Sequence, residues 1–211
     1  MKITSSRACS SVAYWTSDMR TVDLFVEDRA HEEFLKALVQ RLAREASVAI
    51  EVRVRSARGG HGLALKELGL YQHGVAKGLA GLTQPDVLVV GIDANCRPFS
   101  EARKLVEESI APSFRNATAI ACPDPHVERW YLADPESFKE AVGKQPRLGR
   151  RKCERDLYKN RLAQAVAAAG HPPTLGGLEF AQEIVEAMDL YRAGKNERSL
   201  KHFLDDIQRV L

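Results

Sequence analysis

A continuous apolar run that stops at an acid is the feature that most limits the fold of this chain. Residues 87–92 read Val-Leu-Val-Val-Gly-Ile, and Asp93 follows them. A strand with one face in water alternates apolar and polar residues, whereas a strand covered on both faces is apolar throughout. The run therefore predicts a central strand of an α/β sheet, with helices on both faces and Asp93 at its carboxyl end.

Two other apolar runs also lead to acids. Residues 22–26 precede Glu27, and residues 117–122 precede Asp124 and Glu128. The carboxyl ends of parallel strands lie at one edge of a sheet, where α/β proteins form their sites. Carboxylates gathered there repel one another, and a bound divalent cation relieves the repulsion. We therefore expect these acids to converge on a cation site.

Helical spacing of apolar residues separates the strands. It predicts helices over about 31–44, from about 62 to 79, and over about 100–110, while alternation over 48–54 predicts a half-exposed edge strand. Repeated strand–helix units are typical of a parallel sheet with right-handed crossovers. The expected fold class is α/β, with a mainly parallel, Rossmann-like sheet and flanking helices.

The pattern becomes helical after the third acidic strand end. Asp124-Pro125 and Asp134-Pro135 each look like a helix N-cap followed by proline at the first helical position. Apolar spacing predicts three more helices, over about 154–169, 178–191 and 198–210. Because the composition shifts near residues 143–149, we expect an α/β core with an N-terminal arm over 1–143 and a C-terminal helical extension over 144–211.

Composition excludes several classes of protein. The 211-residue chain is 45% apolar and 28% charged, which is typical of a globular domain. No segment reaches the roughly 20 apolar residues of a membrane span, and the first twenty residues lack a secretory signal, so we expect a cytoplasmic protein without a membrane partner. The four cysteines are widely spaced without a Cys-x-x-Cys pair, which predicts reduced thiols rather than a zinc or redox motif.

Basic residues cluster between Lys144 and Arg161, although the net charge is only +3. Such a run is commonly a solvated helix face, but clustered Arg and Lys also make sequence-independent contacts to phosphate. We expect it to contact nucleic acid, together with a glycine-rich turn at 58–62. The predicted nucleic-acid-binding residues are Arg58, Arg150, Arg151, Lys152 and Arg155.

Several stretches resemble the Toprim family. Residues 25–35, Phe-Val-Glu-Asp-Arg-Ala-His-Glu-Glu-Phe-Leu, resemble its first motif, in which a strand-terminal glutamate opens a turn into a helix. Residues 90–95, Val-Gly-Ile-Asp-Ala-Asn, resemble its Asp-x-Asp motif. Residues 123–135 and 198–204 are similar to blocks of small stand-alone Toprim-like proteins related to the OLD nucleases, which are often encoded beside ABC-type ATPases in prokaryotic phage-defence loci.

The resemblance implies a Mg²⁺- or Mn²⁺-dependent nuclease that cleaves DNA or RNA with a partner ATPase of the ABC or AAA type. The resemblance also implies that Glu27 acts as a general acid/base or as a metal ligand, and that Asp93 is a metal ligand. This agrees with the preference of hard cations for oxygen ligands and with two-metal sites, whose ions lie about 3.5–4 Å apart. The expected supporting ligands are Asn95, Glu32 and Glu128.

Two positions depart from the Toprim pattern. Asp28 stands where the family usually has glycine, and Asn95 replaces the second acid of Asp-x-Asp, so one negative charge is missing unless a nearby acid supplies it. This leaves two alternatives open. One is a non-catalytic regulatory or sensor subunit of an ATPase complex, and the other is a small-molecule phosphotransferase, which would not need the basic run.

Simpler roles remain open for several of these residues. Glu27 and Asp93 could each cap the following helix. His126-Val127-Glu128 resembles the His-x-Glu of zinc deaminases, but the Pro-Cys-x-x-Cys of those enzymes is absent, and no histidine has metal-ligand spacing. We expect most of the histidines to be ordinary surface or core groups, and Trp130 and Leu132 to be packing residues.

Overall fold

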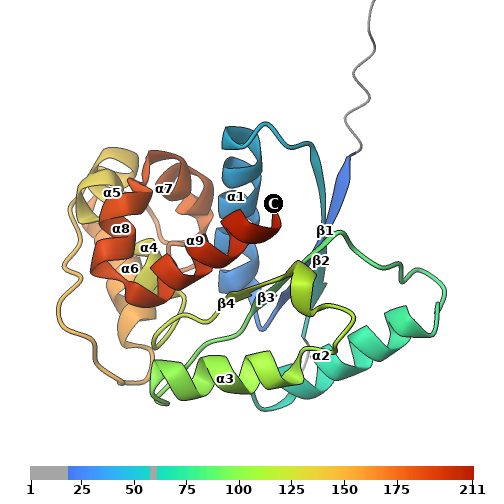
Figure 1. Cartoon of the computed structure of the whole chain (residues 1–211). Coiled ribbons are helices and arrows are strands. Elements are labelled where there is room, and N and C mark those ends of the chain that lie inside the picture. Colours follow the sequence, from blue (N-terminus) through green and yellow to red (C-terminus); the bar gives the residue numbers. More distant parts are fainter. Residues whose placement is uncertain (1–18, 58–60) are drawn as a thin grey trace, which may run out of the picture.

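A four-stranded, all-parallel sheet organises the fold (Figure 1). The computed structural model describes residues 19–57 and 61–211, so the predicted N-terminal arm and Arg58 lie outside the described residues. The strands are β1 (Arg20–Val26), β2 (Ile50–Ser56), β3 (Val87–Gly91) and β4 (Thr118–Ala121), in the order β2-β1-β3-β4. The predicted α/β class is confirmed, and β2 is the half-exposed edge strand that its alternation indicated.

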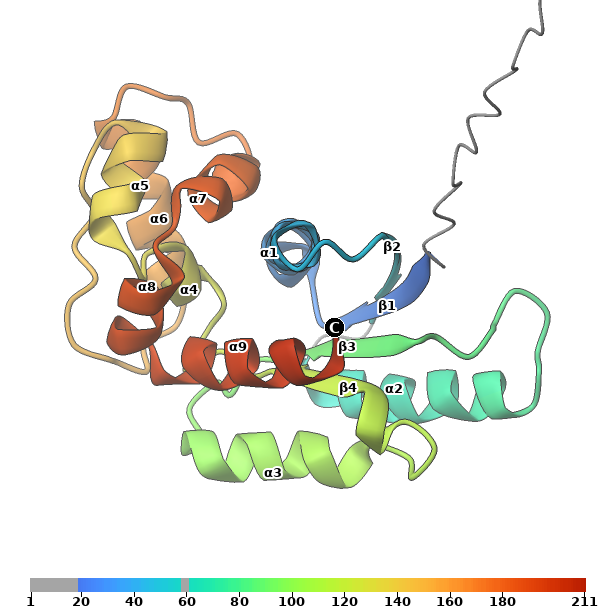
Figure 2. The same cartoon turned by 45° about the horizontal axis from the view of Figure 1, so that its top comes forward.

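Helices cover both faces of the sheet (Figure 2). Helix α1 (Arg29–Glu45) lies on one face, whereas α2 (His61–Ala76) and α3 (Phe99–Ser109) lie on the other. The chain goes outward from β1 to β2 and then crosses back to β3 on the far side of β1. The direction of winding therefore reverses between β1 and β3, and crevices at such switch points are where open α/β sheets bind their ligands.

The C-terminal half is helical and packs on the α1 face of the sheet. Its helices are α4 (Glu128–Tyr131), α5 (Pro135–Val142), α6 (Leu157–Ala168), α7 (Ala181–Ala187), α8 (Leu190–Asn196) and α9 (Arg198–Val210), and short 3₁₀ turns occupy Arg115–Ala117 and Leu178–Phe180. The single helix predicted over 178–191 is wrong, because Met188 is extended and Asp189 caps a new helix.

Of the two helix starts predicted at Asp-Pro pairs, the structure has one. Asp134 stands at the N-cap position of α5 with Pro135 in its first turn, as predicted, although its side chain makes no capping hydrogen bond. The same prediction for Asp124-Pro125 is wrong, because that bond is cis in a loop and the next helix starts at Glu128. Within the described ranges, no helix has the length and apolar character needed to cross a bilayer.

Helix α9 closes the outer edge of the sheet. An edge strand exposes unpaired backbone groups. At β4, the Ile120 N–H donates to Asp206 Oδ2 at 3.1 Å, and Arg209 Nη2 donates to the carbonyl oxygen of Thr118 at 3.0 Å. Side chains of the last helix thus take the place of a fifth strand.

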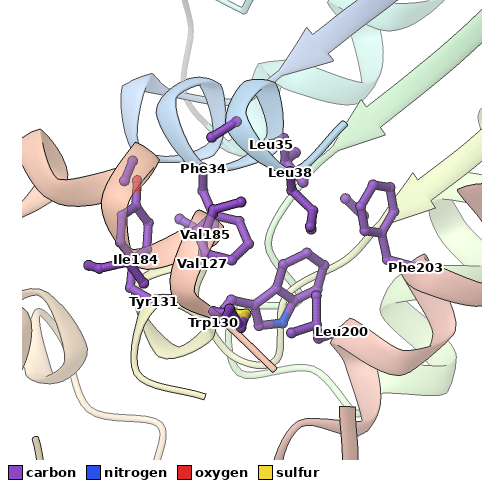
Figure 3. Close-up of a cluster of buried hydrophobic side chains, with 14 of the residues drawn as sticks. Phe34, Leu35, Leu38, Val127, Trp130, Tyr131, Ile184, Val185, Leu200 and Phe203 are labelled. Atoms are coloured by element: carbon purple, nitrogen blue, oxygen red, sulfur yellow. The ribbon is translucent and has the colours of Figure 1, made fainter. Parts of the chain in front are cut away.

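An aromatic cluster joins α1, α4 and α9 (Figure 3). The ring of Phe34 lies 6.0 Å from Trp130 and 4.8 Å from Tyr131, and Trp130 stacks on Phe203 at 5.8 Å. Trp130 and Leu132 are fully buried, which confirms them as packing residues. Apolar side chains from residues before and after position 143 pack in the same buried cluster. The domain boundary near residue 143 stays a prediction.

Candidate functional site

Glu27 and Asp93 meet at the switch point of the sheet. Strand β1 ends at Val26, opposite Gly91 at the end of β3. The Glu27 N–H donates to the Gly91 carbonyl at 2.9 Å, and the Asp93 N–H donates to Glu27 Oε2 at 3.2 Å. The fold therefore brings together two acids that lie 66 positions apart in the sequence.

Two histidines flank the Asp93 carboxylate. His31 Nε2 lies 3.0 Å from Oδ1, and His126 Nδ1 lies 3.0 Å from Oδ2. The contact with His31 has ion-pair distance without the angle of a hydrogen bond. The other nitrogen of His31 lies 2.8 Å from Asp28 Oδ1. His31, which is fully buried, thus bridges two carboxylates. These two histidines are exceptions to the expectation that most histidines are ordinary surface or core groups.

Electrostatics favour positive charge on both imidazoles. Burial opposes a charge on His31, but the carboxylates of Asp93 and Asp28 outweigh it and raise its pKa well above 6.5. The hydrogen bond with Asp93 also raises the pKa of His126, against a smaller effect of burial. Burial would raise the pKa of Asp28, yet its bonds with His31 lower it to about 2. The repulsion expected between the gathered acids is therefore relieved in part by imidazoles.

Local sequence explains how His31 reaches the site. Asp28 is the N-cap of α1 and accepts from the His31 N–H at 3.1 Å. The capping role left open for Glu27 thus belongs to Asp28, the residue that departs from the Toprim pattern. Gly91 lets α1 lie close to β3, because a Cβ there would sit 2.6 Å from Leu35 Cδ1 and 3.4 Å from His31 Cδ2.

A pocket of about 350 Å³ opens beside Asp93. Its lining combines acids with an amide, an imidazole and basic side chains: Asp28, Asp93, Asn95, His126, Glu128, Arg155 and Lys159, with Cys96, Cys153, Asp156 and Tyr158. Asn95 has a left-handed backbone (φ 53°), which asparagine tolerates better than most residues, and its buried Nδ2 lacks a hydrogen-bond partner. Glu27 contacts Asp93 but is not part of this lining.

Glu128 is held at the pocket by the aromatic cluster. It is the first residue of α4, the helix that carries Trp130 and Tyr131. Trp130 Nε1 donates to Ser199 Oγ at 2.9 Å, and the Tyr131 hydroxyl donates to the Ala30 carbonyl in the first turn of α1 at 3.0 Å. Burial, followed by the charge of Asp93, raises the pKa of Glu128. The packing of α4 therefore places the half-buried Glu128 at the pocket that Asp93 also lines.

Other predicted residues lie apart from this pocket. Glu32 accepts a hydrogen bond from Ser56 Oγ at 3.2 Å, at the end of β2, and does not line the pocket. Asp124 pairs with Arg151 at 2.6 Å. The structure therefore groups Asp93, Asn95 and Glu128 around the pocket, with Glu27 against Asp93, and leaves Glu32 outside.

The basic run is a loop for most of its length, because α6 begins only at Leu157. We call residues 144–156 the basic segment. Within it, Arg155 is 95% exposed and lines the pocket, Lys152 pairs with Glu154 at 3.2 Å, and Arg150 is exposed. The interpretation of the whole run as a solvated helix face is therefore wrong.

A disulfide joins Cys96 to Cys153 and corrects the prediction of reduced thiols. The two Cα atoms lie 5.5 Å apart, although 57 positions separate the residues. Spacing along the chain could not reveal this pair, because the fold alone brings the basic segment to the loop after β3. Cys122 is free and buried.

The pocket suits a magnesium ion by the type of its donors. Mg²⁺ is commonly held by one or two carboxylates, substrate phosphates and water. Asp93, Glu128 and the amide oxygen of Asn95 could supply such oxygens. Across residues 19–57 and 61–211, no group of three or more His, Cys, Asp or Glu side chains is placed to hold a metal ion. The residues thus fit a site that relies on water and phosphate rather than a complete protein cage.

Comparison with known proteins adds no relative. No protein-family model matches the chain, and neither a curated protein nor a solved structure gives a match. His31 and His126 are the site residues that sequence reasoning missed. The sequence signal that could have identified them is their position, because each follows the end of a strand that also places an acid at the same edge of the sheet.

Proposed function

We propose that this chain is a Mg²⁺- or Mn²⁺-dependent, Toprim-like nuclease that cleaves phosphodiester bonds in DNA or RNA. The supporting observation is the contact between Glu27 and Asp93 at the switch point, beside a pocket with oxygen donors and basic side chains. The Toprim resemblance adds the reaction and a partner ATPase in prokaryotic phage defence, and the composition of the sequence adds the cytoplasmic location.

Each group of the pocket has a distinct part in this proposal. Asp93, Asn95 and Glu128 would hold the cation, which when bound polarises a phosphoryl oxygen and lowers the pKa of water. Glu27 takes up the proton of the attacking water and returns one to the leaving oxygen. Arg155 and Lys159, at the pocket, and Arg151, beside Asp124, bind backbone phosphate without reading sequence.

A charge-removing substitution tests the assignment of Glu27. Glu27→Gln keeps the shape of the side chain but cannot accept a proton, so cleavage of single- and double-stranded DNA and RNA with Mg²⁺ or Mn²⁺ should fall about 10²–10⁴-fold. Glu33→Gln is the matched control, because Glu33 lies on α1, the helix that follows Glu27, and pairs with Arg29 at 3.2 Å. Cleavage by Glu27→Gln at the wild-type rate, with an unchanged melting temperature, would contradict the proposal.

A second candidate is a non-catalytic subunit that regulates or senses for an ATPase. Both Asp93 oxygens lie 3.0 Å from imidazole nitrogens, and Asn95 stands where Toprim enzymes carry an acid. Calorimetric titration of Mg²⁺ and Mn²⁺ separates the two candidates. Heat of binding that disappears in Asp93→Asn supports the enzyme, whereas the absence of heat in the wild type supports the subunit.

A further inference from the structure

The disulfide lies between the two parts of the candidate site. Cys96 follows Asn95 directly in the loop after β3, and Cys153 belongs to the basic segment. Both cysteines line the pocket, as do Asp93 and Arg155. The covalent bond thus joins the loop that carries Asp93 and Asn95 to the segment that carries the basic side chains.

Within the part of the chain that the structure describes, hydrogen bonds anchor the basic segment as far as Lys152. Arg151 Nε donates to Asp124 Oδ1 at 2.6 Å, and Arg151 Nη2 donates to the Arg97 carbonyl at 3.4 Å. Arg161 Nη1 donates to the Leu148 carbonyl at 2.7 Å, and Arg129 Nη1 donates to the Gly149 carbonyl at 3.4 Å. The Lys152 N–H then donates to the hydroxyl of the buried Tyr158 at 2.9 Å.

Beyond Lys152, the ion pairs are local. Lys152 pairs with Glu154 at 3.2 Å and Arg155 with Asp156 at 3.5 Å, all within the segment itself. Such pairs between exposed side chains contribute little to stability. The disulfide is therefore the strong tie between the end of the basic segment and the loop after β3.

The disulfide is also open to reagents. Cys96 and Cys153 are both exposed, so a small thiol can reach either sulfur. Cys122 differs, because burial raises the pKa of its thiol to about 12 and withholds it from exchange. In a reducing compartment, an exposed disulfide is commonly transient and regulatory rather than structural.

We propose that Cys96 and Cys153 form a reversible redox latch that holds the end of the basic segment, residues 153–156, at the pocket when oxidised and releases it when reduced. A dithiol of low molecular weight is the reductant. Its first thiolate attacks one sulfur, the S–S bond breaks, and a mixed disulfide forms with one cysteine. Its second thiolate then displaces that cysteine, so two electrons and two protons pass to the protein, which ends with two thiols while the reagent ends as a cyclic disulfide.

Release of the latch changes which basic side chains at the pocket can bind phosphate. In the oxidised protein, Arg155 lines the pocket that Asp93 also lines. In the reduced protein, the end of the basic segment leaves the pocket, and Arg155 with it. Lys159 stays, because it belongs to α6. The latch itself depends only on the disulfide and the segment, while its control of cleavage rests on the proposed nuclease function.

Limited trypsin digestion tests the latch without any assay of activity. Trypsin cuts after Arg and Lys, so the released end of the basic segment offers the bonds after Lys152 and Arg155, whereas the bonds after Arg150 and Arg151 lie in its anchored part. Full-length protein oxidised with glutathione disulfide is compared with protein reduced by dithiothreitol, and the cleaved bonds are identified by mass spectrometry. Reduction should raise the rate of cutting within the segment at least about tenfold.

Two variants sharpen this test. Cys96→Ser should be cut at the fast rate with or without dithiothreitol, whereas Cys122→Ser should respond as the wild type does. Equal rates in oxidised and reduced wild-type protein would overturn the latch. So would alkylation showing two free thiols at Cys96 and Cys153 after the oxidising step.

A parallel measurement separates this inference from the proposed function. The oxidised and reduced proteins are assayed for Mn²⁺-dependent cleavage of the same nucleic acids. A redox-dependent digestion pattern in a protein that cleaves no nucleic acid would retain the latch and reject the nuclease. Cleavage that is unaffected by reduction, with an unchanged digestion pattern, would reject the latch and retain the nuclease.

Discussion

The imidazole bridge of His31 allows a prediction whose size follows from the structure. His31→Leu replaces a fully buried bridge by an apolar side chain and leaves the buried Asp93 with His126 as its remaining imidazole partner. Breaking a buried ion pair from one side typically costs ~3–5 kcal/mol. Asp28 adds little to this cost, because its side chain is 53% exposed and still accepts from the backbone of residue 31. We therefore expect the free energy of unfolding to fall by about 3 kcal/mol, the low end of that range.

A double-mutant cycle in urea at neutral pH measures this cost. Asp93→Asn removes the charge that His31 compensates, so His31→Leu should cost at least ~1.5 kcal/mol less in that background than in the wild type. His73→Leu, on the exposed side of α2, is the control and should change stability by less than about 0.5 kcal/mol. A cost below about 1 kcal/mol for His31→Leu, or equal costs in the two backgrounds, would refute the electrostatic bridge.

Two other positions carry predictions of stability. Gly91→Ala places a Cβ 2.6 Å from Cδ1 of the fully buried Leu35, so that side chain must move, and the free energy of unfolding in urea should fall by ~1–3 kcal/mol. An unchanged value would show that the close approach is not required. Burial would raise the pKa of Asp134, but hydrogen bonds from Arg192 and Ser137 lower this pKa below 3.8 in the folded protein. The ionised Asp134 carboxylate therefore stabilises the fold above pH 3.8, and this stabilisation is lost as the pH falls through the lowered pKa. Asp134→Asn should therefore cost ~1.5–3 kcal/mol at neutral pH and progressively less in acid, and a cost independent of pH would contradict this assignment.

The fold was predictable because its strands and main helices follow local rules. The continuous run before Asp93 belongs to β3, which is covered on both faces, and the alternation around residue 52 belongs to the edge strand β2. The helical spacing from Phe34 onward gives α1. These patterns place Glu27 and Asp93 at strand ends, and parallel pairing then brings them to one edge.

The remaining features depend on contacts that sequence spacing does not encode. His31 and His126 reach Asp93 from two different elements, and only the packing of α1 and of the loop before α4 determines their direction. Cys96 and Cys153 meet because the basic segment folds back over the loop after β3. The break at Met188 is likewise tertiary, because Asp134 accepts from the backbone N–H of Asp189 at 2.9 Å.

The location of a bound cation tests the central claim most directly. Crystals soaked in Mn²⁺ would be measured at a wavelength at which manganese scatters anomalously. We predict an anomalous peak at about 2.0–2.2 Å, the ligand distance of a small hard cation, from an Asp93 carboxylate oxygen, and loss of that peak in Asp93→Asn. A peak elsewhere, or none at the pocket while nucleic acid is still cleaved, would contradict the account.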